Sequence, residues 1–216
     1  MSAESGIPTF RGGDGLWENH RIEDVASPEG WQRDPLMVLE FYNQRRKQII
    51  ASEPNNGHYL LAKLQEHFDV QIITQNIDNL HERAGSKNVL HLHGEIMKAR
   101  STVDPTLVYE LKHWELKAGD KCERGSQLRP QIVWFGEAVP MIEPAAELTA
   151  SADIFVVVGT SLQVYPAAGL VQYAPYNIPK YIIDPQIPHV SGIQQLRSIE
   201  AGASEGLEEL YHLLLK

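Results

Sequence analysis

Three short runs of apolar, mostly β-branched residues limit the folds that this chain can adopt. They are VQII (70–73), IFVVVG (154–159) and KYIID (180–184). Each is bounded by polar or turn-forming residues, a pattern typical of strands buried on both faces of a parallel sheet. A shorter run, VLHLH (89–93), alternates and is a weaker candidate for a fourth strand.

Helical patterns lie between these runs. Asp34 and Pro35 indicate an N-cap followed by proline at the first helical position, and apolar residues then recur at helical spacing up to Ile49. Further helices are expected at 60–68, 143–150 and 166–174, with a last one opening near Ser204. Strands that alternate with helices predict a doubly wound α/β fold.

Residues 97–127 interrupt this alternation. They are polar and of mixed charge, without a long apolar period, so they predict a small inserted module. The loop-rich stretch 12–30 is typical of a cover over a site. We therefore expect 1–96 and 128–216 to form the large domain, with a helical cover segment over about 12–56.

Charge and cysteine content exclude some classes of function. The net charge of −9 over 216 residues argues against a nucleic-acid partner, because such proteins present a basic face. No apolar run reaches the roughly 18 residues that a membrane helix needs, so no membrane partner is expected. The single cysteine, Cys122, excludes a disulfide within the chain and favours a cytoplasmic location.

Small or hydrogen-bonding residues follow three of the strands, in TQNID (74–78), GTSL (159–162) and DPQ (184–186). Ligands of doubly wound sheets bind at such carboxyl ends. Asn76 and Asp78 can hold hydroxyl groups. Gly159 allows a phosphate to approach the backbone, where Thr160 and Ser161 can donate to it. Each residue alone is commonly a cap or turn former, but three strand ends of this kind favour a ligand site.

The segment HLHGE (91–95) contributes a candidate for proton transfer. Histidine is the side chain best suited to that task near neutral pH, although a single histidine is often only structural. Because His91 and His93 alternate along the expected strand, only one of them should face a cleft.

Five motifs occur in the order found in sirtuins, the NAD-dependent protein-lysine deacylases. They are SGIPTFRG (5–12), TQNIDNLHERAG (74–85), HLHGE (91–95), LRPQIVWFGE (128–137) and GTSLQVYPAAGL (159–170). The chain resembles this family from residue 2 to about residue 205. The resemblance implies a large Rossmann-like domain and a smaller one, with NAD and an acyl-lysine peptide meeting between them.

The resemblance also implies a mechanism. His93 would be the general base, deprotonating a ribose hydroxyl after the acyl oxygen has displaced nicotinamide, so that O-acyl-ADP-ribose is released. Asn76 would position a water and the ribose, and Asp78 would bind the nicotinamide amide beside Ile77. The resemblance implies further NAD contacts: Phe10 and Arg11 over the ribose and phosphates, and Gln75 at the ribose. On the phosphate and adenosine side they are Gly159, Thr160 and Ser161. Asp184 would contact the adenosine ribose, where many relatives carry Asn, and Ala203 would lie near the adenine.

The segment VWFGE (133–137) is expected to be a strand to which the substrate peptide adds, with the acyl-lysine entering an apolar tunnel. The residues concerned are Val133, Trp134, Phe135 and Gly136. Taken alone, the two aromatic residues would more often be part of the core.

Tyr42 and Arg45 are three residues apart on an expected helix and so share a face. A guanidinium pairs bidentately with a carboxylate, and a phenol can add one hydrogen bond. The pair resembles the Tyr-x-x-Arg of the desuccinylase and demalonylase subgroup, and acetyl-lysine need not be excluded. The alternative is an amphipathic helix that carries a solvated arginine.

The chain departs from the family in the small module. Many relatives hold a structural zinc there with two cysteine pairs, whereas this segment has only Cys122. Ser101, Asp104, His113 and Asp120 offer no recognisable ligand spacing. We therefore expect no zinc and no other metal.

A second departure concerns the start of the sequence. The family motif continues upstream with an apolar strand and Gly-Ala-Gly, so we expect that about 10–15 residues are missing here. A naturally shortened protein is the alternative. Two other functions also stay open, mono-ADP-ribosyl transfer and non-catalytic binding of ADP-ribose or a peptide, but HLHGE and VWFGE favour deacylation.

Overall fold

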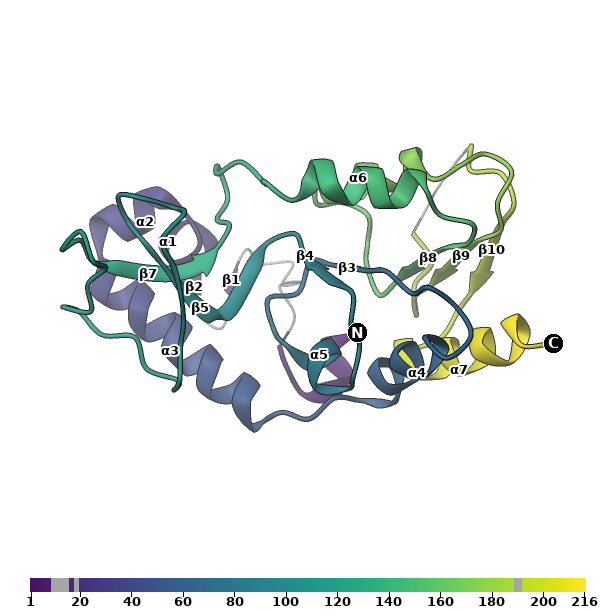
Figure 1. Ribbon diagram of the computed structural model, residues 1–216, viewed down its shortest axis with the longest axis horizontal. Helices are drawn as coiled ribbons and strands as arrows, with labels where there is room; N and C mark the ends of the chain where they lie inside the picture. The colour runs from purple at the N-terminus through teal and green to yellow at the C-terminus, as the bar shows by residue number, and fades with distance from the viewer. Residues whose placement is uncertain (9–15, 18–19, 189–191) are drawn as a thin grey trace.

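The computed structural model describes residues 1–8, 16–17, 20–188 and 192–216. They form an elongated molecule with two lobes (Figure 1). Its elements in chain order are η1 (Ser2–Ser5), β1 (Leu16–Trp17), β2 (His20–Arg21), α1 (Ile22–Val25), α2 (Pro28–Arg33), α3 (Pro35–Ala51), α4 (Asn56–Leu64), β3 (Ile72–Thr74), α5 (Leu80–Arg83), β4 (Val89–His91), β5 (Gly94–Ser101), β6 (Val108–Glu110), β7 (Leu128–Ile132), α6 (Ile142–Ala150), β8 (Phe155–Val158), η2 (Ala167–Tyr173), β9 (Lys180–Ile183), β10 (Leu196–Ile199) and α7 (Ala203–Leu214).

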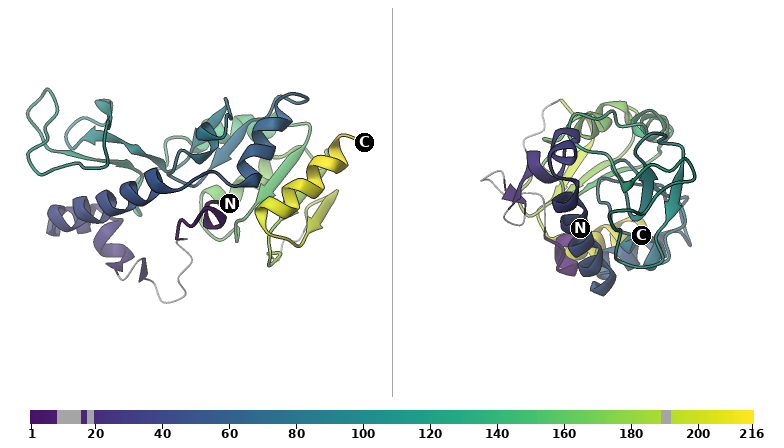
Figure 2. Two further views of the ribbon diagram at one scale, coloured as in Figure 1. Left: turned by 90° about the horizontal axis from the view of Figure 1, so that it is seen from below. Right: turned by 90° about the vertical axis from the view of Figure 1, so that its left-hand side faces the viewer.

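The large lobe contains two parallel pieces of sheet. Strands β10, β9 and β8 form one piece in that order, and β3 pairs with β4 in the other. Helices α4 and α7 lie side by side (Figure 2) and pack against β8 and β9. Helices α6 and η2 pack against β3 and β4 through a separate apolar cluster. The four predicted strands and the α/β class are confirmed.

Three features of the large lobe differ from the expectation. The helix expected at 60–68 is α4, which begins at Asn56 and ends at Leu64. Strand β10, of sequence LRSI, was not predicted because its exposed Arg197 and Ser198 give it no continuous apolar run. The segment expected as a helix at 166–174 is the 3-10 helix η2.

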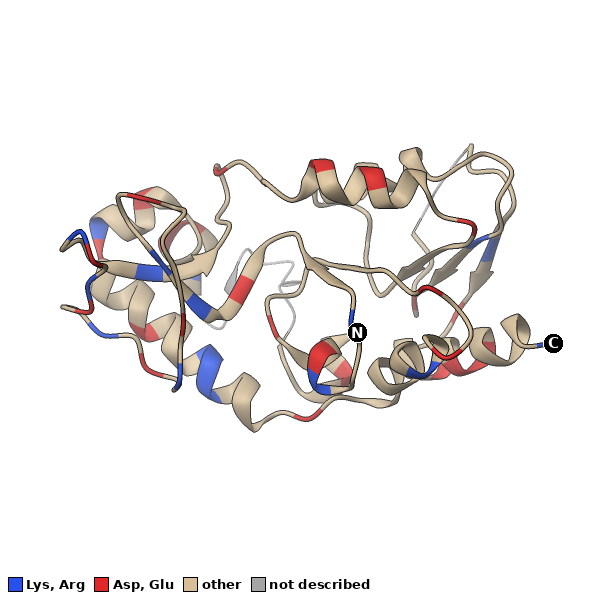
Figure 3. Cartoon of the chain, viewed as in Figure 1, with Lys and Arg blue, Asp and Glu red and all other residues tan. Residues whose placement is uncertain are grey.

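The small lobe is built on an antiparallel sheet in the order β6, β5, β7. It runs from Gly94 to Ile132 and so extends past both ends of the module expected at 97–127. Gly94 lies against β7 with φ +84°, and a Cβ there would meet the Gln131 carbonyl oxygen at 2.0 Å. Only glycine fits at this crossing. Figure 3 shows Lys and Arg interspersed with Asp and Glu on this lobe.

Hydroxyl groups and an ion pair join the turns at the far end of this sheet. The hydroxyl of Ser126 lies 3.3 Å from that of Ser101 and 2.7 Å from that of Thr102. The Asp104 carboxylate lies 3.0 Å from the guanidinium of Arg124. Within the described residues, no group of three or more His, Cys, Asp or Glu side chains could hold a metal ion.

Helix α3 connects the small lobe to the short helices α1 and α2. Its expected cap is confirmed, because the Asp34 carboxylate accepts a hydrogen bond from the Met37 N–H at 3.0 Å. Arg46 is fully buried and donates to the Ile96 carbonyl at 2.7 Å, which ties the helix to β5. Burial lowers the pKa of Arg46 to about 10, so the side chain stays charged at neutral pH.

Two buried histidines lie between α4 and α5. The rings of His58 and His81 stand edge to face with centroids 4.8 Å apart. The Nδ1 atom of His58 accepts from the Asn55 N–H at 3.2 Å, completing a capping box at the start of α4. Burial, reinforced by His81, lowers the pKa of His58 to about 3. Burial also lowers the pKa of His81, so both rings are neutral at pH 7.

No helix in the described part of the chain combines the length and the apolar character that crossing a membrane requires.

The first prediction concerns the contact between α7 and β9. A Cβ on Gly206 would lie 2.2 Å from the Cγ2 atom of Ile183. Overpacking of this kind costs about 1–3 kcal/mol and outweighs the gain in helix propensity. We expect Gly206→Ala to lower the free energy of unfolding by about 1–3 kcal/mol in urea titrations. Glu208→Ala, on the exposed face of the same helix, is the control, and equal stability of the two variants would contradict this packing.

The second prediction concerns pH. The pKa of His58 is lower in the folded chain than the usual 6.5 of an unfolded one. The unfolded state therefore takes up the proton first, so stability is full above pH 6.5 and falls as the pH drops below it. The slope from one such group approaches about 1.4 kcal/mol per pH unit.

We expect His58→Asn to flatten this fall between pH 6.5 and 5, because asparagine keeps an acceptor for the cap but does not titrate. Denaturant midpoints measured at several pH values test it. The exposed His67→Asn is the control, and identical slopes for His58→Asn and the parent chain would rule out the assignment.

Candidate functional site

A cavity of about 480 Å³ lies between the two pieces of parallel sheet in the large lobe. Four of the predicted cofactor residues line it, Gln75 and Asn76 after β3 and Gly159 and Thr160 after β8. Met1 lines the same cavity. The expectation that these strand ends converge is therefore met for β3 and β8.

The two strand ends are linked by side chains. The Gln75 amide donates to the Thr160 hydroxyl at 3.5 Å. The Asn76 side-chain amide donates to the Ser2 hydroxyl at 2.7 Å, and its backbone N–H donates to the Thr74 hydroxyl at 3.0 Å. The contact from Ser2 was not predicted, because nothing in the sequence links residue 2 to residue 76.

Gly159 lies against the first residue of the chain. Its φ is +63°, and a Cβ there would lie 2.8 Å from the Met1 nitrogen. The polar groups of Gln75, Asn76 and Thr160, which line the cavity, offer hydrogen-bonding partners for the sugar and phosphate groups of a dinucleotide. The residues present therefore fit NAD.

His93 follows β4 and is hydrogen-bonded to the end of β3. Its Nδ1 lies 3.1 Å from the Gln75 carbonyl oxygen. A carbonyl only accepts, so Nδ1 carries the proton and Nε2 of the neutral ring carries the lone pair. Burial lowers the pKa of His93, partly offset by the bond to Gln75. The ring is thus held as a neutral base near pH 7.

His91, the other histidine of the motif, has a different role. Its Nδ1 lies 3.1 Å from the Asn76 carbonyl oxygen, and its Nε2 lies 2.8 Å from the Glu82 carboxylate. The carboxylate offsets burial and raises the pKa of His91. His91 therefore supports the backbone of Asn76, a contact that alternation along a strand could not reveal.

Asp78 and Ile77, which follow Asn76 in the chain, make contacts with α5 and with the apolar core. Asp78 is buried, and its carboxylate accepts from the Leu80 N–H at 3.1 Å at the start of α5. Ile77 packs against the large core cluster, and its carbonyl accepts from the Ile96 N–H at 2.8 Å. Both contacts fix the loop that carries Asn76.

The residues predicted for the adenosine side lie at the ends of β9 and α7. Asp184 is buried and accepts from the Gln186 N–H at 2.9 Å. Ala203 is buried at the start of α7, where its N–H and that of Ser204 donate to the Glu4 carboxylate. Glu4 thus caps α7, a use of the helix dipole that was not predicted. Ser161 is half-buried next to Thr160.

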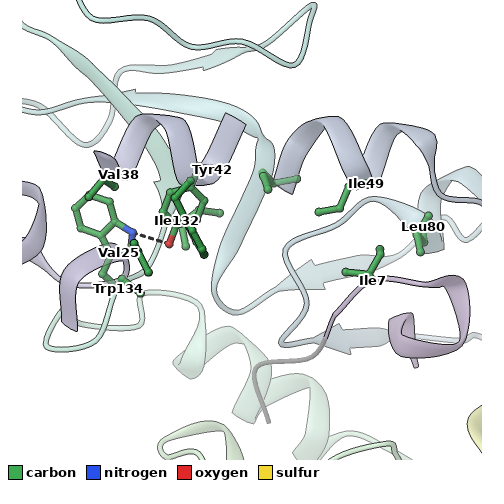
Figure 4. Close-up of a cluster of buried hydrophobic side chains, with 11 residues drawn as sticks. Ile7, Val25, Val38, Tyr42, Ile49, Leu80, Ile132 and Trp134 are labelled. Atoms are coloured by element: carbon green, nitrogen blue, oxygen red, sulfur yellow. Dashed lines mark hydrogen bonds between the residues drawn. The ribbon is translucent and has the colours of Figure 1, made fainter. Parts of the chain in front are cut away.

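Tyr42 and Trp134, two of the residues predicted to bind the substrate, lie in a cluster of buried side chains (Figure 4). The Trp134 indole N–H donates to the Tyr42 hydroxyl at 3.0 Å. The Arg129 guanidinium lies 3.2 Å from the centre of the Trp134 ring and pairs with the Glu137 carboxylate at 2.7 Å. Tyr42 is fully buried, and desolvation raises its pKa. The phenol therefore stays protonated and keeps a proton that it can donate.

Arg45 also lies on the buried face of α3. Its guanidinium donates to the Pro8 carbonyl at 3.3 Å and lies 5.9 Å from the centre of the Phe41 ring. The exposed fraction of Arg45 is only 3%. A solvated arginine is therefore excluded, and the helix face shared by Tyr42 and Arg45 is confirmed.

The strand expected over 133–137 is wrong. Strand β7 ends at Ile132, and the chain then turns at Gly136, which has φ +86°. The turn is held by Glu137, whose carboxylate accepts from the Trp134 N–H at 2.8 Å. Val133 donates its N–H to the His93 carbonyl at 2.9 Å, and the Phe135 side chain is 49% exposed.

Phe10 and Arg11, predicted to cover the ribose and phosphates of NAD, lie outside the described residues.

Comparison with known proteins places this site in a family. Residues 1–166 match the model of the Sir2 family. The chain is 54% identical over 220 residues to an NAD-dependent protein deacylase of Bacteroides thetaiotaomicron, covering 100% of this chain and 94% of that protein.

Solved structures agree. A Sir2 homologue in complex with ADP-ribose has a TM-score of 0.89 and 38% identity, covering 100% of this chain and 90% of that one. A Sir2 protein bound to an acetylated peptide has a TM-score of 0.80 and 28% identity, with coverage of 98% and 88%. Family model, sequence relatives and fold agree, and the chain belongs to the Sir2 family.

Proposed function

We propose that this chain is an NAD-dependent protein-lysine deacylase. The observation that carries the proposal is the bond from Nδ1 of His93 to the Gln75 carbonyl. It directs the basic Nε2 away from Gln75, and Gln75 itself lines the cavity that fits the cofactor. A fixed, neutral imidazole next to a nucleotide site is the arrangement that general-base catalysis on a ribose hydroxyl needs.

NAD, when bound, supplies a ribose carbon whose bond to nicotinamide can be broken. Nε2 of His93 accepts the proton of the ribose hydroxyl. Asn76 orients the ribose and a water, with its backbone supported by His91 and its side chain by Ser2. The products of the proposed reaction would be nicotinamide, O-acyl-ADP-ribose and the free lysine side chain of the peptide.

The acyl-lysine peptide is proposed to bind at Val133, Trp134, Phe135 and Gly136. The backbone of Val133 is bonded to that of His93, so a peptide lying along this segment would pass next to the base. The exposed Phe135 offers an apolar surface to the lysine stem. The solved complex of a relative with an acetylated peptide supports this class of substrate.

We further propose that the acyl group is acidic, succinyl or malonyl, with acetyl also accepted. Tyr42 and Arg45 lie on one face of α3, and both are buried. Tyr42 is hydrogen-bonded to the Trp134 indole, and Arg45 is hydrogen-bonded to the Pro8 carbonyl. A buried guanidinium and a protonated phenol together would bind a carboxylate by charge-assisted hydrogen bonds. We also propose that the enzyme is cytoplasmic and that its small lobe folds without a structural zinc ion.

The third prediction tests the base. We expect His93→Gln to lower kcat for deacylation at least 100-fold while the protein still binds ADP-ribose, because glutamine has no lone pair of comparable basicity. Nicotinamide release and peptide mass, followed with an acetyl-lysine and a succinyl-lysine peptide, give the readout. His67→Gln is the control, and full activity of the His93 variant would refute the role.

The fourth prediction tests the acyl preference. We expect Arg45→Met to lower kcat/KM for a succinyl-lysine peptide at least tenfold more than for the matching acetyl-lysine peptide, because only the succinyl group presents a carboxylate. The retained deacetylation reports that the variant is folded. Lys47→Met, an exposed change on the same helix, is the matched control. An equal loss on both peptides would mean that Arg45 does not bind the acyl carboxylate.

A further inference from the structure

His91, at the end of β4, has both of its ring nitrogens against acceptor atoms. Nδ1 lies 3.1 Å from the Asn76 carbonyl oxygen, and Nε2 lies 2.8 Å from a Glu82 carboxylate oxygen. A carbonyl and an ionised carboxylate only accept, so both contacts are hydrogen bonds only if each nitrogen carries a proton. This geometry describes an imidazolium, whereas His93 is held as a neutral ring.

Glu82 keeps its negative charge in this contact. Desolvation favours its neutral form, but the hydrogen bond from His91 outweighs that effect and holds the pKa of Glu82 below its usual value. The His91 side chain is only 6% exposed and that of Glu82 is 40% exposed. An opposite charge at this distance favours the protonated imidazole, so the proton of the pair stays on His91 at neutral pH.

Other titratable groups near His91 do not replace this carboxylate. They are His81 of α5 with its neighbour His58 of α4, and Glu95 of β5 with its ion-pair partner Lys98. The two histidines are neutral at pH 7, and the Glu95 carboxylate lies 2.8 Å from the lysine ammonium. Strand β3 carries no titratable residue. Helices α6 and η2 pack on the other face of β4, through Leu90 and Leu92.

The bond to Glu82 closes a loop that carries two of the proposed site residues. From Asn76 the chain passes Asp78, whose carboxylate accepts from the Leu80 N–H at the start of α5. Glu82 lies on the same helix and is joined through His91 to the carbonyl of Asn76. The imidazolium therefore ties the first residue of this loop to the helix that ends it.

Loss of one proton from His91 would break one of its two bonds. The neutral ring would keep its remaining proton toward Glu82, because a hydrogen bond to an ion is stronger than one to a neutral carbonyl. The lone pair of Nδ1 would then face the carbonyl oxygen of Asn76, and the two would repel each other. Deprotonation therefore releases Asn76 from α5.

We propose that His91 is a positioning residue, whose imidazolium, bonded to Glu82, holds the Asn76 loop in place for the reaction. The inference rests on the proposed deacylase function and adds a second titration to it. Because His93 must be neutral and His91 must be charged, activity falls on the acid side through His93 and on the alkaline side through His91. Burial lowers the pKa of His93, whereas in His91 the effect of burial is outweighed by Glu82 and the pKa is raised.

The first experiment follows the bond itself in the whole chain, without NAD or peptide. Imidazole ¹³C and ¹⁵N chemical shifts give the charge of His91 at each pH. The amide signal of Ile77, which shares a peptide plane with the Asn76 carbonyl, reports the hydrogen bond to that carbonyl. We expect the pKa of His91 to lie above 6.5 and the Ile77 signal to follow the same curve.

The matched variants change the partner carboxylate. In Glu82→Gln, both titration curves should move down by about one pH unit, because the opposite charge is lost. Glu66→Gln, a substitution of an exposed residue with the same change in charge, is the control and should leave them in place.

The second experiment measures kcat/KM for deacylation against pH. In Glu82→Gln the alkaline limb should move down by the same amount as the pKa of His91. His91→Leu, which has no donor, should lower kcat about tenfold or more at every pH, because Asn76 is no longer held in place. His91→Asn keeps a donor near the position of Nδ1 but does not titrate, so it should restore most of that activity and lack the alkaline limb.

An alkaline limb that stays in place while the pKa of His91 moves in Glu82→Gln would overturn the proposal. So would a His91 pKa at or below 6.5, or an Ile77 signal that does not follow it. If the parent chain releases no nicotinamide at any pH, the deacylase proposal fails. The Ile77 titration needs no turnover, so it still supports or overturns the bond through which His91 acts.

Discussion

His93 is bonded to both lobes, and the arrangement of the site depends on this one residue. Its ring donates to the Gln75 carbonyl at the end of β3, while its own carbonyl accepts from Val133 at the end of β7. The first bond selects the tautomer, and the second holds Val133 next to His93. A shift of one lobe relative to the other would therefore disturb the hydrogen bond that selects the tautomer of the imidazole.

A second chain of contacts starts from the Glu137 carboxylate. It accepts from the Trp134 backbone and pairs with the guanidinium groups of Arg129 and Arg100. Arg129 lies over the Trp134 ring, and that ring donates to the Tyr42 hydroxyl. The orientation of the Tyr42 phenol therefore depends on the Glu137 carboxylate through the Trp134 ring that lies between them in this chain of contacts. This explains why a turn, rather than the expected strand, follows β7.

The sequence predicted well what depends on local pattern. The apolar runs became strands because each is long enough and rich enough in β-branched residues to be buried, and Asp34 with Pro35 marked the start of α3 correctly. Contacts between distant segments could not be read in this way. Ser2 with Asn76 and Glu4 with the start of α7 join residues that no periodicity relates. Likewise, strand LRSI lacks an apolar signature because two of its four side chains are exposed.

The small lobe closes its outer turns with the hydroxyls of Ser101, Thr102 and Ser126 and with the ion pair between Asp104 and Arg124. The ion pair is exposed on its Arg124 side and is weakened by salt, since mobile ions screen such charges. The outer turns of the small lobe should therefore loosen as the ionic strength rises.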